Sequence, residues 1–137
     1  MKPILIEGKT FSDDRGKIFH INNFDFSPIK RMYIIENINT DQLRGWKGHM
    51  IENRWFYCQT GKIEIQTVSI KCFETKKPEI QIFNLTEQNL NILFIPKGYA
   101  TTIKQNQNKS RVVAMSDYLL GESNDENLSW PSNFFNK

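Results

Sequence analysis

The sequence predicts an all-β protein that folds as a single antiparallel sandwich or barrel. Short runs of apolar and β-branched residues recur along the middle of the chain, and clusters of turn-forming residues separate them. No long segment repeats its apolar residues at the 3.6-residue period of an amphipathic helix, so we expect little helix. A chain of 137 residues can bury one core, and we expect one domain over residues 1–137.

Each expected strand is a short run bounded by turn residues. The alternation is clearest over residues 62–73, where Ile63 and Ile65 lie on one face and Glu64 lies on the other. In chain order, the expected strands cover residues 29–38, 54–58, 62–73, 80–84, 90–95, 99–105 and 111–119. The expected turns cover residues 13–16, 60–62, 76–78, 96–98 and 106–109.

The last part of the chain, from about Gly121, is a polar tail with an aromatic end. Trp130, Phe134 and Phe135 lie near its terminus. Because exposed aromatic rings forgo the free energy of burial, we expect these rings to pack on the body of the domain or on a partner subunit.

The composition is that of an ordinary globular protein, with 39% hydrophobic and 24% charged residues. The net charge is +3, and the lysines are spread too thinly to form a basic stripe for nucleic acid. No segment reaches the ~20 apolar residues that span a membrane, and the first residues lack a signal peptide's apolar core. We therefore expect a cytoplasmic protein without nucleic-acid or membrane partners. Cys58 and Cys72 are expected to be buried thiols, with a disulfide as the alternative.

The most informative feature is the segment 44–49, Arg-Gly-Trp-Lys-Gly-His. It places the guanidinium of Arg44, the ammonium of Lys47 and the imidazole of His49 within six residues, shortly before the expected strand 54–58. A cationic, titratable cluster at the mouth of a β-structure suits a small anionic ligand and proton transfer. A purely structural role is the alternative for His49.

Four short motifs occur in order along the chain: Asp14-Arg15-Gly16, Ile29 to Tyr33, Arg44 to His49, and Ser116-Asp117-Tyr118. Together they resemble the sugar-nucleotide cupins, which include the dTDP-4-dehydrorhamnose 3,5-epimerases and the dTDP-4-keto-6-deoxyglucose 3,4-ketoisomerases. The resemblance runs from Asp14 to about Trp130. It implies a double-stranded β-helix, or cupin jelly roll, in a homodimer. It also implies a dTDP-sugar substrate and a place in deoxysugar and cell-surface polysaccharide biosynthesis.

The ketoisomerases resemble this chain more closely than the epimerases do. Their Arg-Gly-aromatic-His-x-His segment aligns without gaps on residues 44–49, with its second histidine on His49 and its first on Lys47. The tyrosine that epimerases use as a general acid falls on Val113, and the ketoisomerases lack it too. Lys47 is then either a base, if burial or the nearby Arg44 favours its neutral form, or a ligand for a phosphate or carbonyl oxygen. In the second case His49 carries the proton transfers.

We expect no metal site. Metal-binding cupins use a His-x-His pair, a glutamate and a later histidine, but here the pair begins with lysine and the later position is Thr101. His49 and Glu52 alone are too few for a catalytic site with three protein ligands. No glycine-rich dinucleotide fingerprint is present, so no redox cofactor is expected. The other histidine, His20, sits in an apolar run and is expected to be structural.

Strand alternation bears on the remaining candidates. Arg31 and Tyr33 share a face, so both point into the barrel or both point out. If Arg31 points in, its guanidinium needs an anion, which a pyrophosphate would supply through two hydrogen bonds. Arg54 begins a strand and can face either way. Trp46 suits either core packing or stacking on a ligand, and Tyr118 is a candidate ligand contact.

These residues support one functional hypothesis and two alternatives. The first is a metal-independent isomerase that moves the keto group of a nucleotide-linked 4-keto-6-deoxyhexose through an enediol. His49 would move the proton, Lys47 or Tyr33 would polarise the oxygen, and Arg31 and Arg44 would bind the pyrophosphate or the enolate. The alternatives are a C3 or C5 epimerase of the same substrate class, and a non-catalytic cupin that binds a sugar nucleotide or serves as a partner domain.

Overall fold

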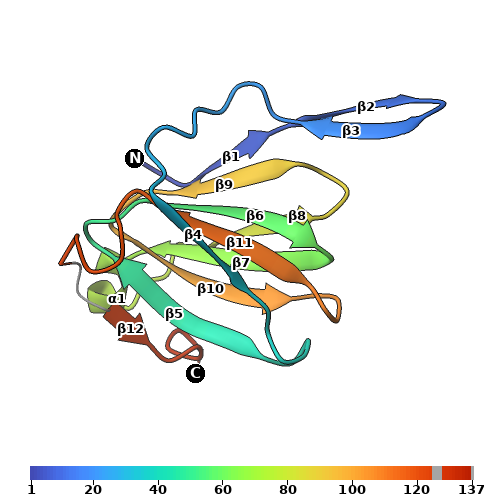
Figure 1. Cartoon of the computed structure of the whole chain (residues 1–137). Coiled ribbons are helices and arrows are strands. Elements are labelled where there is room, and N and C mark those ends of the chain that lie inside the picture. The colour runs from blue at the N-terminus through green and yellow to red at the C-terminus, as the bar shows by residue number, and fades with distance from the viewer. Residues whose placement is uncertain (125–127, 137) are drawn as a thin grey trace.

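The computed structural model describes residues 1–124 and 128–136, which form two antiparallel five-stranded sheets, a separate hairpin and one short helix (Figure 1). The first sheet, in the order β1-β9-β6-β11-β4, contains β1 (Ile4–Glu7), β4 (Arg31–Ile35), β6 (Arg54–Thr60), β9 (Asn91–Ile95) and β11 (Arg111–Ser116). The second, in the order β12-β5-β10-β7-β8, contains β5 (Leu43–His49), β7 (Lys62–Ser69), β8 (Gln81–Thr86), β10 (Tyr99–Gln105) and β12 (Leu128–Trp130). The predicted all-β jelly roll is confirmed.

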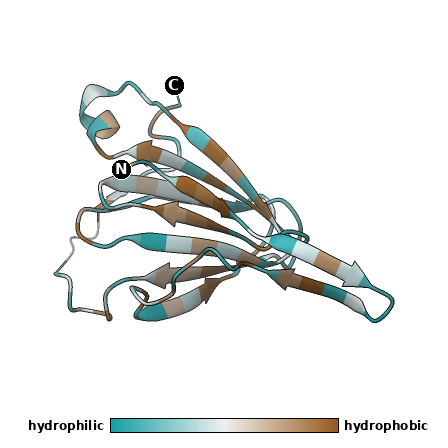
Figure 2. Cartoon of the chain, turned by 90° about the horizontal axis from the view of Figure 1, so that it is seen from above, coloured by the Kyte–Doolittle hydropathy of each residue, from teal (hydrophilic) through white to brown (hydrophobic). Residues whose placement is uncertain are grey.

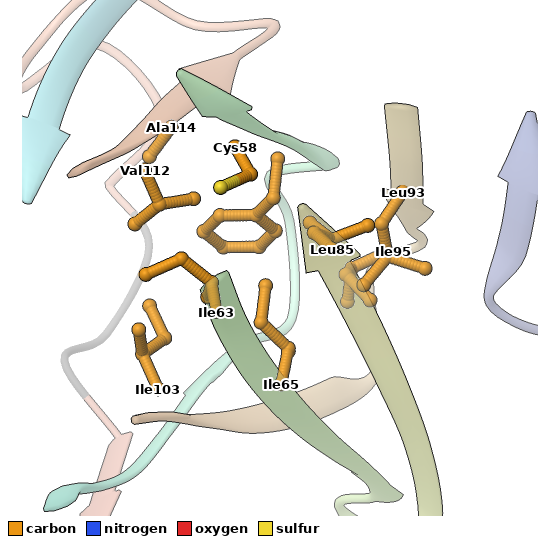
Figure 3. Packing of buried hydrophobic residues seen from close by; sticks show 10 residues of the cluster. Cys58, Ile63, Ile65, Leu85, Leu93, Ile95, Ile103, Val112 and Ala114 are labelled. Carbon is orange, nitrogen blue, oxygen red and sulfur yellow. The ribbon is translucent and has the colours of Figure 1, made fainter. Parts of the chain in front are cut away.

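The core between the two sheets is built from alternate residues of the central strands. Figure 3 shows isoleucine, leucine and valine side chains from both sheets converging on one another, with Ile65 and Leu93 fully buried. The predicted alternation of the run 62–73 is confirmed here, since Ile63 and Ile65 enter this core while Glu64 does not. Burying a side chain of this size contributes about 1.5–3 kcal/mol, so this cluster is the main source of stability.

Each sheet also buries its outer face. Residues around Ile21, Phe24 and Ile29 pack on the outside of the first sheet. On the outside of the second sheet, the ring of Trp130 stacks on Phe73 with their centroids 3.8 Å apart. The predicted tail therefore packs on the body of the domain, although its residues 125–127 and 137 lie outside the described part of the chain.

The strand prediction differs from the structure at both ends of the sheets. The expected strand 62–73 ends at Ser69, and α1 (Lys71–Thr75) follows, with Phe73 as its buried residue. Strands β1, β5 and β12 and the hairpin of β2 (Lys9–Asp13) and β3 (Gly16–His20) were not predicted. A register shift breaks the alternation of β5. The other strands are short or largely exposed, so a burial pattern does not mark them in the sequence.

The β2–β3 hairpin extends away from the body and pairs with neither sheet (Figure 1). Its tip is polar, but apolar residues follow its strands (Figure 2), and the exposed fractions of Phe11, Ile18 and Phe19 are 52%, 57% and 42%. An isolated two-stranded hairpin is marginally stable in water. The hairpin is therefore a surface that a partner would stabilise.

Both cysteines are free thiols, Cys58 buried and Cys72 partly buried, so the disulfide alternative is not realised. Burial, reinforced by the charge of Glu87, raises the pKa of Cys58 to about 11. Among the described residues, no helix has the length and apolar character needed to cross a membrane.

Candidate functional site

A cavity of about 810 Å³ opens between the two sheets. Strands β4, β6 and β9 form one wall, and β5 and β10 form the other, with Ser129 and Trp130 of β12 at its margin. The cavity lies beside β4, which is the last strand of the first sheet, and β5, which is next to the edge of the second. A volume of this size suits a ligand larger than a simple sugar, because pockets of ~300–1,000 Å³ hold drug-sized ligands.

A register shift in β5 decides which cations reach the cavity. Lys47 is opposite Thr101 of β10, and Arg44 is opposite Ile103, so Gly45 and Trp46 together face Thr102. In an unbroken strand, residues three apart point to opposite faces. The extra residue, a β-bulge, brings Arg44 to the same face as Lys47. Arg44, Lys47 and His49 therefore all line the cavity.

The cations of the β5 wall have neutral neighbours. The Nε–H of Arg44 donates a hydrogen bond of 2.7 Å to the side-chain oxygen of Asn37. Lys47 is exposed, and its strand neighbours are Thr101 on β10 and Ser129 on β12. Within residues 1–124 and 128–136, the ion pairs include neither Arg44 nor Lys47.

At the opposite wall, Arg54 lines the cavity, and it shares one carboxylate with Arg31, which lies behind the wall and does not line the cavity. Glu52 Oε1 lies 3.0 Å from Nη2 of Arg54 and 3.3 Å from Nη2 of Arg31. Arg31 also donates from Nε to the backbone oxygen of Tyr118 at 3.1 Å. The residue Arg54 is only 5% exposed. A guanidinium buried to this degree requires a nearby anion, and Glu52 supplies it.

Glu52 is held in its charged form by several groups at once. Ser116 donates a hydrogen bond of 2.5 Å to Oε1, and Ser123 donates one of 2.8 Å to Oε2. Burial alone would raise the pKa of the Glu52 carboxyl, but the two serine hydroxyls and the charges of Arg54 and His49 outweigh burial and hold that pKa below its ordinary value. At the wall formed by β4, β6 and β9, called the first wall below, the negative charge of Glu52 thus balances part of the positive charge of Arg31 and Arg54 in a single ion network.

Tyr33 projects from this network into the cavity. Its phenolic oxygen accepts a hydrogen bond of 2.6 Å from Nη1 of Arg54. The guanidinium carbons of Arg31 and Arg54 lie 5.4 Å and 5.8 Å from the centre of its ring. Because the oxygen accepts from Arg54, its own O–H hydrogen must point elsewhere. Tyr33 can therefore donate a hydrogen bond to an oxygen of a ligand in the cavity.

The structure brings together most of the residues that the sequence singled out. Tyr33, Arg44, Lys47, His49 and Arg54 all line the cavity. The prediction that Arg31 and Tyr33 share a face is confirmed by their pairing with Ser116 and Ala114 on β11. Arg31, however, does not line the cavity as Tyr33 does, and the anion beside it is Glu52, where the sequence suggested a pyrophosphate.

Trp46 and Tyr118 are placed differently. Trp46 borders the cavity, but it is 2% exposed and its ring makes edge-to-face contacts with Phe73 and Phe135 on the outer side of the second sheet. This placement matches the packing alternative. Tyr118 does not line the cavity, and its backbone oxygen binds Arg31.

Val113 lies on the face of β11 that points away from the cavity. It pairs with Ile34 and Tyr57 and packs with Trp55 and Met115 on the outside of the first sheet. The absence of the epimerase tyrosine at this position therefore does not separate the ketoisomerases from the epimerases.

Two residues of the site were missed in the sequence. Asn37 lies in an irregular segment between two strands, where no periodicity marks it. Glu52 was considered only as a metal ligand, yet it pairs with Arg31 and Arg54. Across the described ranges 1–124 and 128–136, no three His, Cys, Asp or Glu side chains form a group that could hold a metal ion.

Comparisons with known proteins support the fold. No family model and no curated protein matches the sequence. Solved structures do match. A variant of the 3,4-ketoisomerase QdtA from Thermoanaerobacterium thermosaccharolyticum, in complex with TDP-4-keto-6-deoxyglucose, has a TM-score of 0.70 at 20% identity, covering 91% of this chain and 86% of its own. A dTDP-4-dehydrorhamnose 3,5-epimerase from Bacillus anthracis, with TDP and pyrophosphate bound, has a TM-score of 0.74 at 16% identity, covering 93% and 79%.

A 3,4-ketoisomerase from Helicobacter canadensis is also similar, with a TM-score of 0.70 at 20% identity, covering 92% of this chain and 90% of its own. These likenesses extend over nearly the whole chain. They show that the fold is that of the sugar-nucleotide cupins.

Proposed function

We propose that this protein is a metal-independent isomerase of a nucleotide-linked 4-keto-6-deoxyhexose, most simply a dTDP-sugar 3,4-ketoisomerase. One observation carries the proposal: a single cavity presents the exposed cations Arg44 and Lys47, the imidazole of His49 and the phenol of Tyr33 on facing walls. The cations suit a diphosphate, and the imidazole and phenol suit proton transfer at a carbonyl. The fold shared with the ketoisomerase that binds TDP-4-keto-6-deoxyglucose supports the same substrate class.

The proposed reaction moves a proton between neighbouring carbons. The 4-keto group acidifies the C3–H bond, and His49 removes that proton while the electron pair forms an enediolate. Tyr33 donates its O–H hydrogen bond to the developing oxyanion, and Arg54 holds the phenol in place. Transfer of the 3-hydroxyl proton and return of a proton to C4 complete the 3-keto product, so no electron acceptor is required.

We assign Lys47 to ligand binding. A lysine serves as a base only where burial or a close cation favours its neutral form, and Lys47 is exposed at the margin of the cavity. Its ammonium suits a phosphate oxygen. His49 then carries the proton transfers alone, because Lys47 stands where the ketoisomerase motif has its first histidine. Positioned acid–base groups contribute roughly 10²–10⁴-fold each, so turnover with one imidazole is chemically reasonable.

The test is proton NMR of dTDP-4-keto-6-deoxyglucose with the protein in deuterated water. Deuterium at C4 of a newly formed 3-keto sugar is the expected result. Incorporation at C3 or C5 with an unmoved keto group would replace ketoisomerase with epimerase. Broadened ligand signals without exchange would instead show a non-catalytic binding protein. The lysine at position 47, where ketoisomerases have a histidine, favours this alternative. Full activity is expected after treatment with a chelator, and loss restored by a divalent ion would overturn the metal-independent assignment.

A matched variant tests the role of His49. His49→Asn keeps the polarity and size of the side chain but removes the base, so turnover should fall by at least ~10²-fold. Binding of TDP should change by less than about twofold, because Arg44 and Lys47 remain. Equal loss of turnover and of binding would contradict this assignment.

We also propose that the protein is a homodimer that covers the β2–β3 hairpin. The exposed Phe11, Ile18 and Phe19 support this, since a monomer gains nothing from displaying them. Light scattering after size-exclusion chromatography should give twice the mass of the chain for the wild type. Ile18→Asp should shift the protein toward the monomer, and a monomeric wild type would contradict the proposal.

A further inference from the structure

Asn37 is a buried residue whose side-chain nitrogen and oxygen both form hydrogen bonds to nearby protein groups. It lies between β4 and β5 and is 6% exposed. Its side-chain Nδ2 donates to the backbone oxygens of Gln42 and Ile103, each at 3.2 Å. Its Oδ1 accepts from Nε of Arg44 at 2.7 Å. The side chain therefore ties the segment before β5 to β10 and ends on Arg44.

The chemistry of these partners fixes the orientation of the amide. Backbone oxygens only accept hydrogen bonds, so the NH₂ group must face Gln42 and Ile103. The oxygen must then face Arg44, whose guanidinium only donates. A carboxylate at this position would set a second oxygen against two carbonyls. Only an amide satisfies the carbonyls and Arg44 together without bringing a negative charge to the guanidinium.

The hydrogen bond to Asn37 occupies Nε of the Arg44 guanidinium and leaves the two terminal nitrogens available to a ligand. Nε is paired with Asn37, whereas no hydrogen bond within residues 1–124 and 128–136 involves Nη1 or Nη2 of Arg44. Among the described residues that line the cavity, the one carboxylate is that of Glu36, which forms an ion pair with Nε of Arg111 at 3.6 Å. Arg44 is thus oriented by a neutral group and keeps its full positive charge.

We propose that Asn37 is a positioning residue for Arg44, which aims the two terminal nitrogens at the anionic part of the ligand and leaves the charge of the guanidinium uncompensated. This inference rests on the proposed function, because it takes the ligand to be a nucleoside diphosphate. It goes further by placing the diphosphate at the Arg44 end of the cavity. At the Arg54 end, Glu52 already neutralises the cation.

The test is a double-mutant cycle on the affinity for TDP and for inorganic pyrophosphate, measured by calorimetry. Asn37→Ala should weaken binding by about tenfold, as expected when a charged group loses its fixed orientation. In an Arg44→Ala background, Asn37→Ala should have no further effect. A loss that persists undiminished in that background would show that Asn37 acts through the loop alone, and it would overturn the inference.

Two further variants separate positioning from folding. Arg44→Lys keeps the charge at an exposed site but lacks the planar fork, so it should weaken binding about as much as Asn37→Ala; unchanged affinity would contradict the inference. Ser110→Ala is the matched control, since Ser110 is also a buried loop residue with two hydrogen bonds to backbone atoms and does not line the cavity. It should lower stability without changing the affinity.

A spectroscopic measurement distinguishes failure of this inference from failure of the proposed function. The Nε–H of Arg44 should give a protected NMR signal in the wild type without ligand, which moves to the position of an unpaired arginine in Asn37→Ala. An unprotected signal in the wild type overturns the inference whatever the ligand is. A protected signal in a protein that binds neither TDP nor pyrophosphate would instead overturn the proposed function and the placement of the diphosphate.

Discussion

Two pairs of cations lie on opposite sides of the cavity, but they present different charges to a ligand. On the side of the first wall, Arg31 and Arg54 share Glu52 and are mostly buried, and of these two only Arg54 lines the cavity. On the β5 wall, Arg44 and Lys47 are exposed, and Arg44 is held by the neutral Asn37. The number of arginines in a site is therefore a poor guide to its charge. The partner of each guanidinium decides whether it stabilises the fold or binds the ligand.

The largest expected effect tests the first wall. Glu52→Ala removes the anion shared by Arg31 and Arg54, and it should lower the free energy of unfolding by about 3–5 kcal/mol, because a buried charge loses its partner. Urea unfolding at pH 7 measures this. Lys47→Ala is the control on the opposite wall and should change stability by less than about 0.5 kcal/mol, as for an exposed residue. Similar costs for both variants would show that the walls do not differ.

Lowering the pH should reproduce part of the loss of stability that Glu52→Ala causes. The folded state holds the pKa of Glu52 below its ordinary value of 4.5, against the effect of burial, through the hydroxyls of Ser116 and Ser123 and the charge of Arg54. The charged carboxylate therefore contributes stability that is fully present above pH 4.5 and is lost as the pH falls through the lower, folded-state pKa. Urea unfolding between pH 7 and pH 3 should show a smaller acid loss for Glu52→Gln. An identical pH dependence would contradict this.

The reciprocal test concerns binding at the β5 wall. Arg44→Ala should weaken TDP binding by about 1.5–3 kcal/mol, the range for hydrogen bonds to a charged group. The loss should shrink at high salt, since the side chain is exposed. Calorimetric titration at two ionic strengths measures both effects. Unchanged affinity would mean that the diphosphate binds elsewhere.

The smallest expected effect concerns the residues that pack against the outer face of β5. A Cβ at Gly45 would lie 3.1 Å from two backbone atoms, those of Trp130 and Ser132, whereas one at Gly48 would lie 2.8 Å from the flexible end of Ile70. Gly45→Ala should cost about 2 kcal/mol and Gly48→Ala about 1 kcal/mol in urea unfolding, because only side-chain ends can shift readily. The reverse order of costs would show that the backbone of Trp130 and Ser132 shifts more easily than the side chain of Ile70.

Much of the fold was predictable because alternation in a buried strand is a local signal. The strand over residues 99–105 has the predicted bounds, and the shared face of Arg31 and Tyr33 follows from a period of two. The β2–β3 hairpin was not predicted, because its exposed strands carry no burial pattern. The end of β7 at Ser69 was also missed, because the following run, Ile70 to Phe73, is as apolar as a strand.

The site was predictable as a set of residues but not as an arrangement. Arg44, Lys47 and His49 stand out by type and closeness in sequence. Their common orientation depends on a bulge that no periodicity reveals. The ion network around Arg54 joins residues that are remote in sequence, as Glu52 and Ser116 are 64 positions apart, and only the folded chain brings them together.

The bulge at Gly45 and Trp46 makes chain length a determinant of cavity charge. Deleting one residue between Arg44 and Lys47 would restore an unbroken ladder and turn Arg44 toward the tail. The deletion would remove a positive charge from the cavity without changing the identity of any charged residue. Sequence comparisons that count matching residues but overlook such gaps would group cavities of different charge, so the spacing should be compared first.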